Sequence, residues 1–361
     1  MRRSPRLLPA LGAIRALGAV RALGTVLAVA IAAACSAPAT LSELTTAERR
    51  ADAGDVDGAI AAYHVAQARC GALRPVRRAR AACGEALIGE AEALEHAQRT
   101  GPAIAAYLAI PARAVDDPTT AAIAIYRAGE LLLRDQQVTP AWTALWRVVT
   151  DYPDEPTAGD ALRTLLRDGR RRDPRALADE MARLLTSLAE TQLADNLLWS
   201  LADLHEHELG NLEAARVYYD RIPVDTPASG LRDDARWRGA LVSRQLHDPA
   251  GAVTRLRGLL ATREVAWFTG SYFSVWLDDA QLLLGQILRD ELHDLPGAAA
   301  AFRKLPEDYP ASILRDDALY ELAVTLDQLH DHAGACAILA RLGREFADSK
   351  YTARAKDLGC P

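Results

Sequence analysis

The chain has 361 residues, of which 50% are hydrophobic, 25% are charged and 6% are aromatic, and its formal net charge is −6. This composition is typical of a folded protein and excludes disorder throughout the chain, while a mean hydropathy of −0.05 excludes a protein of many membrane spans. The length predicts two domains or one elongated repeat array. Because Ala and Leu supply most of the apolar residues, we expect an all-α fold.

Residues 1–34 are predicted to be a signal peptide. An arginine-rich start precedes an apolar run at 22–34 that is too short to span a bilayer. The sequence at 31–35, Ile-Ala-Ala-Ala-Cys, resembles the lipobox of bacterial lipoprotein signal peptides, except that Ala32 stands where Leu is usual. The alternative is ordinary signal-peptidase cleavage nearby, with the cysteine incidental.

The lipobox resemblance implies a lipid anchor. Cys35 would become the first mature residue and carry acyl chains, which anchor stably when there are several, and residues 35–42 would form a linker. Ser36 in place of Asp implies, by the sorting rule of that family, the periplasmic face of the bacterial outer membrane.

Removal of the signal peptide changes the charge of the protein. Residues 35–361 keep 37 basic and 48 acidic residues, a net charge near −11. This charge disfavours nucleic acid and anionic lipid as general partners. We therefore expect membrane contact through the lipid anchor only.

The chain has four further cysteines. An even number of cysteines in an oxidising envelope compartment favours their pairing in disulfides. The pairs that lie close in sequence are Cys70 with Cys83 and Cys336 with Cys360, and each could tie one helix to its neighbour. No Cys-x-x-Cys motif occurs, so the sequence gives no support to redox or zinc roles.

The body of the chain is a repeat. Segments such as Leu246-His-Asp-Pro-Ala-Gly-Ala252 recur, and their last alanine marks the register. These register alanines are Ala59, Ala103, Ala141, Ala178, Ala215, Ala252, Ala298 and Ala335. Their spacings are 44, 38, 37, 37, 37, 46 and 37 residues, and a near-constant period of 37 predicts a solenoid.

Each unit is predicted to be helix, tight turn, helix. Apolar residues recur four and seven positions after the register alanines, which indicates a second helix. Prolines at 153, 227 and 310 then end that helix, because the residue before a proline is pushed out of the α region.

These units resemble the tetratricopeptide repeat (TPR) family. The resemblance rests on the register alanine, the large residue four later (Tyr63, Tyr107, Tyr219, Phe302) and the closing proline, and it departs in the period of 37 rather than 34. It implies a right-handed superhelical solenoid of about eight hairpins plus a C-terminal capping helix over residues 43–361, binding peptides or proteins on its concave face. The combination with a lipobox is similar to TPR proteins of outer-membrane barrel assembly and to Tol-Pal-associated proteins.

The sequence offers only weak candidates for a catalytic or metal-binding site. His247, His293 and His330 occupy equivalent turns and are interpreted as helix C-terminal residues that face the negative end of the dipole. Histidines two apart point to different faces of a helix, so no metal site is predicted. The recurring acid pairs 233–234, 278–279 and 316–317 are interpreted as helix caps and dipole partners. No catalytic motif occurs, and we expect no enzyme activity, cofactor or small-molecule substrate.

One aromatic cluster stands out where the register spacing grows to 46. It contains the candidate partner-binding residues Trp267, Phe268, Tyr272, Phe273 and Trp276. The alternative is a longer first helix in which the last three share a buried face, with Trp267 and Phe268 exposed.

Three functions remain open at this point. The first is a non-enzymatic interaction scaffold, anchored by lipid, that assists assembly or organisation of outer-membrane and periplasmic proteins. The second is a peptidoglycan- or glycan-associated module that supports cell-wall synthesis or turnover. The third is a hydrolase in the non-repeat ends, for which little chain is left.

Overall fold

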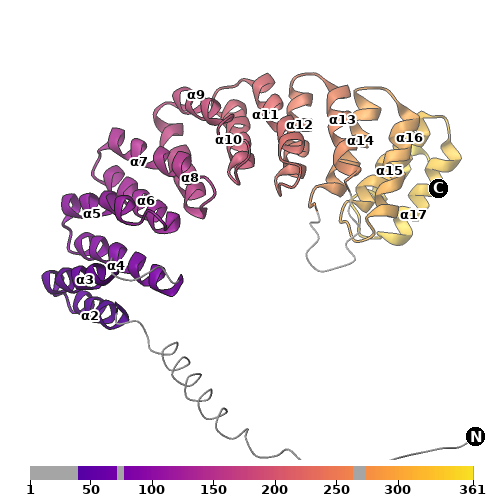
Figure 1. The fold of residues 1–361 in the computed structure, drawn as a ribbon. Coiled ribbons are helices and arrows are strands. Elements are labelled where there is room, and N and C mark those ends of the chain that lie inside the picture. Colours follow the sequence, from indigo (N-terminus) through magenta and orange to yellow (C-terminus); the bar gives the residue numbers. More distant parts are fainter. Residues whose placement is uncertain (1–39, 71–76, 263–273, 361) are drawn as a thin grey trace, which may run out of the picture. The chain divides into compact units, whose positions relative to one another are not determined.

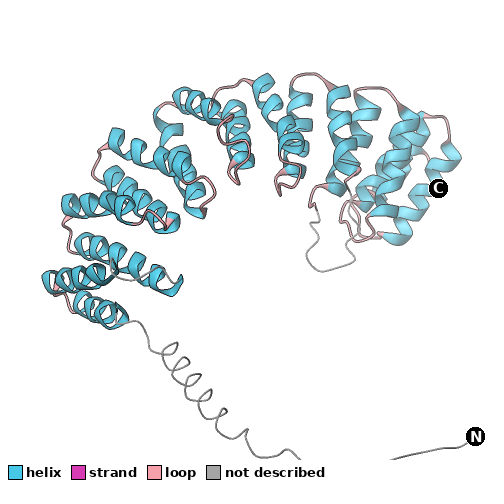
Figure 2. Ribbon diagram, in the orientation of Figure 1, coloured by secondary structure: helices cyan, strands magenta, loops and turns pink. Residues whose placement is uncertain are grey.

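A computed structural model describes residues 40–70, 77–262 and 274–360. Cys35 and the four aromatic residues at 267, 268, 272 and 273 lie outside these ranges. The chain divides into two compact units, residues 1–141 and 142–361. All regular structure in the described ranges is helical (Figure 2), which confirms the all-α prediction. No helix in these ranges is both long enough and apolar enough to span a membrane.

The first unit holds two helical hairpins and the helices that follow them (Figure 1). Its elements are α2 (Thr40–Asp52), α3 (Val56–Cys70), α4 (Arg77–His96), α5 (Thr100–Arg113), α6 (Pro118–Arg134) and the start of α7 (Val138–Asp151). The first helix thus begins at Thr40, inside the segment that was predicted to be a linker.

The second unit continues the same alternation of helices, with neighbouring hairpins stacked side by side (Figure 1). Its elements are the rest of α7, then α8 (Pro156–Arg172), α9 (Pro174–Leu184), α10 (Ala194–His207), α11 (Leu212–Asp225), α12 (Arg232–Gln245), α13 (Pro249–Leu260), α14 (Leu277–Asp290), α15 (Leu295–Asp308), α16 (Arg315–Gln328), α17 (His332–Glu345) and η1 (Thr352–Leu358). The expected capping helix is therefore a short 3-10 helix.

The register alanines explain why the hairpins close. All eight lie on the second helix of a pair, and each is at most 3% exposed. A methyl side chain lets two helices approach closely, and the large residue four positions later fills the next turn. The residues at that position in the clearest repeats, Tyr107, Tyr219 and Phe302, are fully buried. Among the sixteen described helices α2–α17, seven hairpins pack within one unit, with the pairing that the period predicts: α2–α3, α4–α5, α8–α9, α10–α11, α12–α13, α14–α15 and α16–α17.

The turn within each hairpin has its own backbone requirement. Five positions before most register alanines the chain adopts a positive φ, which glycine tolerates best. Glycine fills this position at Gly54 and Gly210. Elsewhere the residue is not glycine: Gln98, Gln136, His247, His293 and His330 have φ between 56° and 62°. The repeated histidines thus lie just past a helix end, in a left-handed conformation.

Candidate functional site

The acid pairs at the start of the first helices join successive repeats. They lie in the first turn of α12, α14 and α16, and the N-cap residues are Leu231, Trp276 and Leu314. The interpretation of these acids as caps is therefore wrong, whereas their place in the first turn agrees with their interpretation as partners of the helix dipole. Instead, the first acid accepts a hydrogen bond from a hydroxyl about one repeat later, as Asp278 Oδ2 does from Ser312 Oγ at 2.6 Å. Asp195 with Ser229 and Asp316 with Ser349 repeat this contact.

Trp276 is part of the packing between repeats. Its ring stacks on Trp237, with centroids 5.2 Å apart and planes 10° from parallel. Its Nε1 donates to Asp234 Oδ1 at 2.7 Å. Tyr351 has the same arrangement two repeats later, where its ring stacks on Tyr320 and its hydroxyl donates to Asp317 Oδ1.

Trp276 also lies outside any helix. Residues 274–276 precede α14 and Trp276 is its N-cap residue, so Trp276 does not belong to the longer helix that was one alternative for this segment, while Tyr272 and Phe273 lie outside the described residues. The extra residues of this repeat lie between Leu260, the end of α13, and Leu277. Of the five candidate partner-binding residues, Trp276 is the one that the structure describes.

The first unit contains a groove of about 480 Å³ between α2, α3 and α4. Its walls carry the carboxylates of Glu48, Asp52 and Glu92, together with His96 and the buried Tyr63. No arginine or lysine is among the described residues that line it. Helices α2 and α4 end at the groove and α3 begins there at Val56, so the positive end of one helix dipole offsets part of the two negative ends, and the acidic side chains supply the net charge.

Tyr63 directs its hydroxyl at this groove. The residue is 5% exposed, and a β-carbon at Gly89, another lining residue, would lie 2.7 Å from Tyr63 Oη. A side chain at position 89 would therefore clash with the Tyr63 hydroxyl, and glycine avoids this clash. Burial raises the pKa of Tyr63, and the carboxylates of Glu48, Glu92 and Asp52 raise it further, so the hydroxyl stays protonated.

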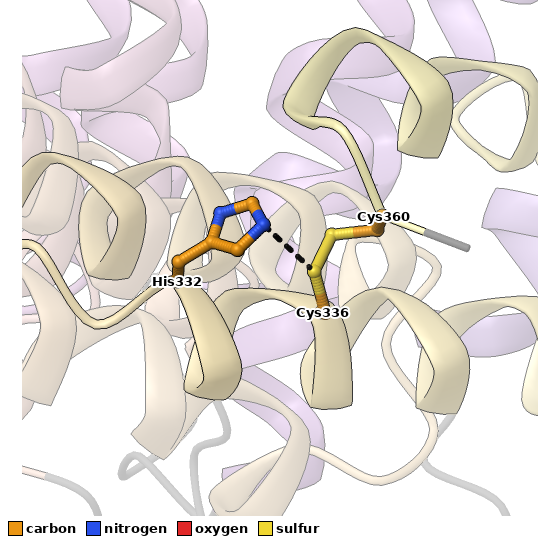
Figure 3. A group of neighbouring side chains, drawn as sticks. All are labelled: His332, Cys336 and Cys360. Carbon is orange, nitrogen blue, oxygen red and sulfur yellow. Dashed lines mark hydrogen bonds between the residues drawn. A yellow bond between two sulfur atoms is a disulfide. The ribbon is translucent and has the colours of Figure 1, made fainter.

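The second candidate is a cluster of His332, Cys336 and Cys360, whose donor atoms lie within 4.8 Å of one another. Figure 3 shows His332 Nε2 directed at Cys336 Sγ, 3.6 Å away, and a disulfide between the two cysteines. His332 Nδ1 in turn contacts Asp327 Oδ1 at 2.8 Å. Because the disulfide consumes both thiolates, this arrangement leaves one nitrogen donor and does not hold a metal ion.

The other cysteine pair, Cys70 and Cys83, is joined at an S–S distance of 2.03 Å and connects α3 to α4. Both pairings are the ones that closeness in sequence suggests. Sequence reasoning missed the four-residue spacing from His332 to Cys336 on one helix, which could have indicated their proximity. It also missed the groove, because the residues that form it were assigned no role beyond the repeat pattern.

Comparison with known proteins identifies the repeats. A sequence model of the tetratricopeptide repeat family matches residues 279–312 and 317–349, each over one hairpin of the second unit. Residues 279–312 and 317–349 are therefore tetratricopeptide repeats, and such repeats indicate a protein–protein interaction scaffold. No curated protein sequence matches the chain.

Several solved structures are similar at low identity. The structure of Naa15/Naa10 bound to HypK-THB is 16% identical, with a TM-score of 0.44, and the match covers 86% of this chain and 43% of that one. This chain thus spans less than half of that relative. YrrB, described as a TPR protein with an unusual peptide-binding site, is 16% identical over 59% of this chain and 98% of its own, with a TM-score of 0.40. A TPR protein from Cytophaga hutchinsonii is 11% identical, with a TM-score of 0.38 and coverage of 87% and 98%.

Proposed function

We propose that this tetratricopeptide-repeat chain is a protein-interaction scaffold of the bacterial cell envelope, anchored by lipid at Cys35. It assists the assembly or organisation of outer-membrane and periplasmic proteins. The repeat array carries this proposal, since hairpins that bury their apolar faces against each other leave long exposed helix surfaces for a partner. Catalysis has no part in it.

Three features of the chain support the envelope setting. The sequence before Cys35 has the order of a lipoprotein signal peptide: basic start, apolar run, small residues and cysteine. The two disulfides suit an oxidising compartment. The acidic charge of residues 35–361 suits a protein that meets the membrane through acyl chains rather than through basic side chains.

The anchor can be tested in a bacterial host that is fed an alkyne-bearing palmitate. The full chain should incorporate the label and sediment with the outer membrane, whereas Cys35→Ser should do neither. A matched pair of control variants, Cys70→Ser and Cys83→Ser, should keep the label. An unlabelled wild-type chain would overturn the anchor.

The scaffold role can be tested by crosslinking in the native envelope. A defined protein should be crosslinked to the chain in stoichiometric amount and should co-purify from detergent extracts. Sedimentation with purified sacculi in place of a protein partner would instead favour the glycan-associated function.

A further inference from the structure

The groove between α2, α3 and α4 contains Tyr63, whose hydroxyl lacks the carboxylate partner that the hydroxyls of two equivalent tyrosines have. Tyr107 Oη donates to Glu95 Oε2 at 3.1 Å, and Tyr219 Oη donates to Glu206 Oε2 at 2.9 Å. Each of these glutamates also binds an arginine from the following repeat, Arg134 or Arg238 respectively. A tyrosine, a carboxylate and an arginine thus form a closed set in both places.

At the first repeat the same set is incomplete. Tyr63 occupies the position that corresponds to Tyr107 and Tyr219, four residues after a register alanine. Its side chain is 5% exposed, and its hydroxyl is not among the fully buried polar atoms that lack a partner, so the oxygen reaches the solvent of the groove instead of a carboxylate of the described residues. Three carboxylates line the space beside it, and the described lining supplies no arginine.

The distances between the carboxylates favour an organic cation over a metal ion as the ligand of the groove. The C-terminal cluster of His332, Cys336 and Cys360 has donor atoms within 4.8 Å of one another. No other group of three His, Cys, Asp or Glu side chains in the described ranges is close enough to hold a metal ion. Glu48, Asp52 and Glu92 are therefore too far apart to chelate one small ion. A guanidinium is planar and carries five N–H donors, so it can reach carboxylates on different walls.

We propose that this groove receives an arginine side chain of the partner protein. The inference rests on the proposed scaffold function and names the chemistry by which one partner contact is made. The guanidinium would bind the carboxylates of Glu48 and Glu92 and donate to Tyr63 Oη, while the hydroxyl donates to a carboxylate, as in the two internal sets. The groove volume of about 480 Å³ accommodates one such side chain with adjoining peptide.

The test uses the full chain in mild detergent, with its ten tyrosines ring-labelled with ¹³C. The signal of Tyr63 is identified by its loss in Tyr63→Phe. N-acetyl-arginine amide, at millimolar concentrations suited to a single side chain, should shift the Tyr63 signal in a saturable manner. N-acetyl-citrulline amide, which has the same shape without the charge, should not.

Charge removal then tests the site itself. Glu48→Gln and Glu92→Gln should each weaken the binding of N-acetyl-arginine amide about threefold to tenfold, the effect of one charge-assisted contact at a partly exposed site. Glu213→Gln removes the same charge from an exposed position in the second unit and should leave binding unchanged. Tyr107→Phe should also leave it unchanged, since that hydroxyl is already bonded to Glu95.

An equal response to citrulline and arginine would overturn the inference, and so would an affinity that Glu48→Gln and Glu92→Gln leave unaltered. Absence of any Tyr63 shift would overturn it as well. A crosslinked envelope partner found together with such a negative result would leave the scaffold function standing, so the two failures can be told apart.

Discussion

Asp278 Oδ2 accepts a hydrogen bond from Ser312 Oγ, although the two residues are 34 positions apart and belong to successive hairpins. The serine Oγ also accepts from the backbone N–H of Leu314, the N-cap residue of α16, at 3.0 Å. One hydroxyl therefore fixes both the entry to a helix and its distance from the preceding repeat. Ser229 and Ser349 do the same for their repeats.

Loss of this hydroxyl should loosen the contact between repeats. Ser312→Ala leaves Asp278 without its donor, and we expect a loss of about 1–2 kcal/mol in the free energy of opening α16. Hydrogen exchange of the α16 amides measures this locally. Ser187→Ala removes an exposed hydroxyl that bonds only its own turn and serves as control. Equal protection in both variants would contradict the expectation.

The turn histidines should be replaceable with a gain in stability. His247, His293 and His330 are exposed and have a positive φ, which a β-carbon disfavours. Each change to Gly should stabilise the chain by about 0.5–1 kcal/mol, as judged from urea unfolding. His96→Gly, in the last turn of α4, should instead destabilise by a similar amount. A change in stability of the same sign at the turn histidines and at His96 would contradict the expected backbone strain at the turn histidines.

Trp276 should matter for stability and not for partner binding. Trp276→Phe keeps an aromatic ring on Trp237 but loses the hydrogen bond to Asp234. We expect a cost of about 1 kcal/mol in unfolding free energy, with crosslinking to the envelope partner retained. Lost crosslinking at unchanged stability would instead place Trp276 in the interface.

His205 should make stability depend on pH. Burial lowers its pKa, Asp179 opposes this shift, and Nδ1 is buried without a hydrogen-bond partner among the described residues. Because the folded pKa lies below the unfolded value of 6.5, stability should be full above pH 6.5 and fall as the pH drops below it. His205→Phe keeps the ring against Tyr218 and should flatten the profile of urea midpoints between pH 7.5 and about 5.5. His96→Phe, at an exposed position, is the matched control.

The Cys336–Cys360 disulfide should hold the C-terminal 3-10 helix on α17. Its loss in the double variant to Ser should cost about 3 kcal/mol on the loop-closure estimate, and amide protection should fall first around Tyr351. Reduction of the wild type should lower the amide protection around Tyr351 to the same degree and should not lower it further in the double variant, because the Cys70–Cys83 disulfide that reduction also breaks lies in the first unit. An unchanged thermal midpoint after reduction would contradict this.

The sequence was sufficient for the repeat and its register. A period of 37 and a small residue at each mark predicted which helices pair and which alanines are buried, because those features depend on neighbours close in sequence. The bond from Asp278 to Ser312 could not be predicted in this way, since helix propensity explains an acid in a first turn without it. The groove was hidden for a similar reason: Tyr63 follows the same pattern as Tyr107, and only the fold shows that one hydroxyl has a partner and the other does not.

The two disulfides have a consequence for how the array comes apart. A linear array normally unzips from its terminal repeats, because a terminal repeat has a neighbour on one side only. Here Cys70–Cys83 ties the first hairpin to the second, and Cys336–Cys360 closes the last one. Fraying from either end is thereby penalised, so melting should start at internal repeats, and thiol reduction should move the starting point outward to the ends.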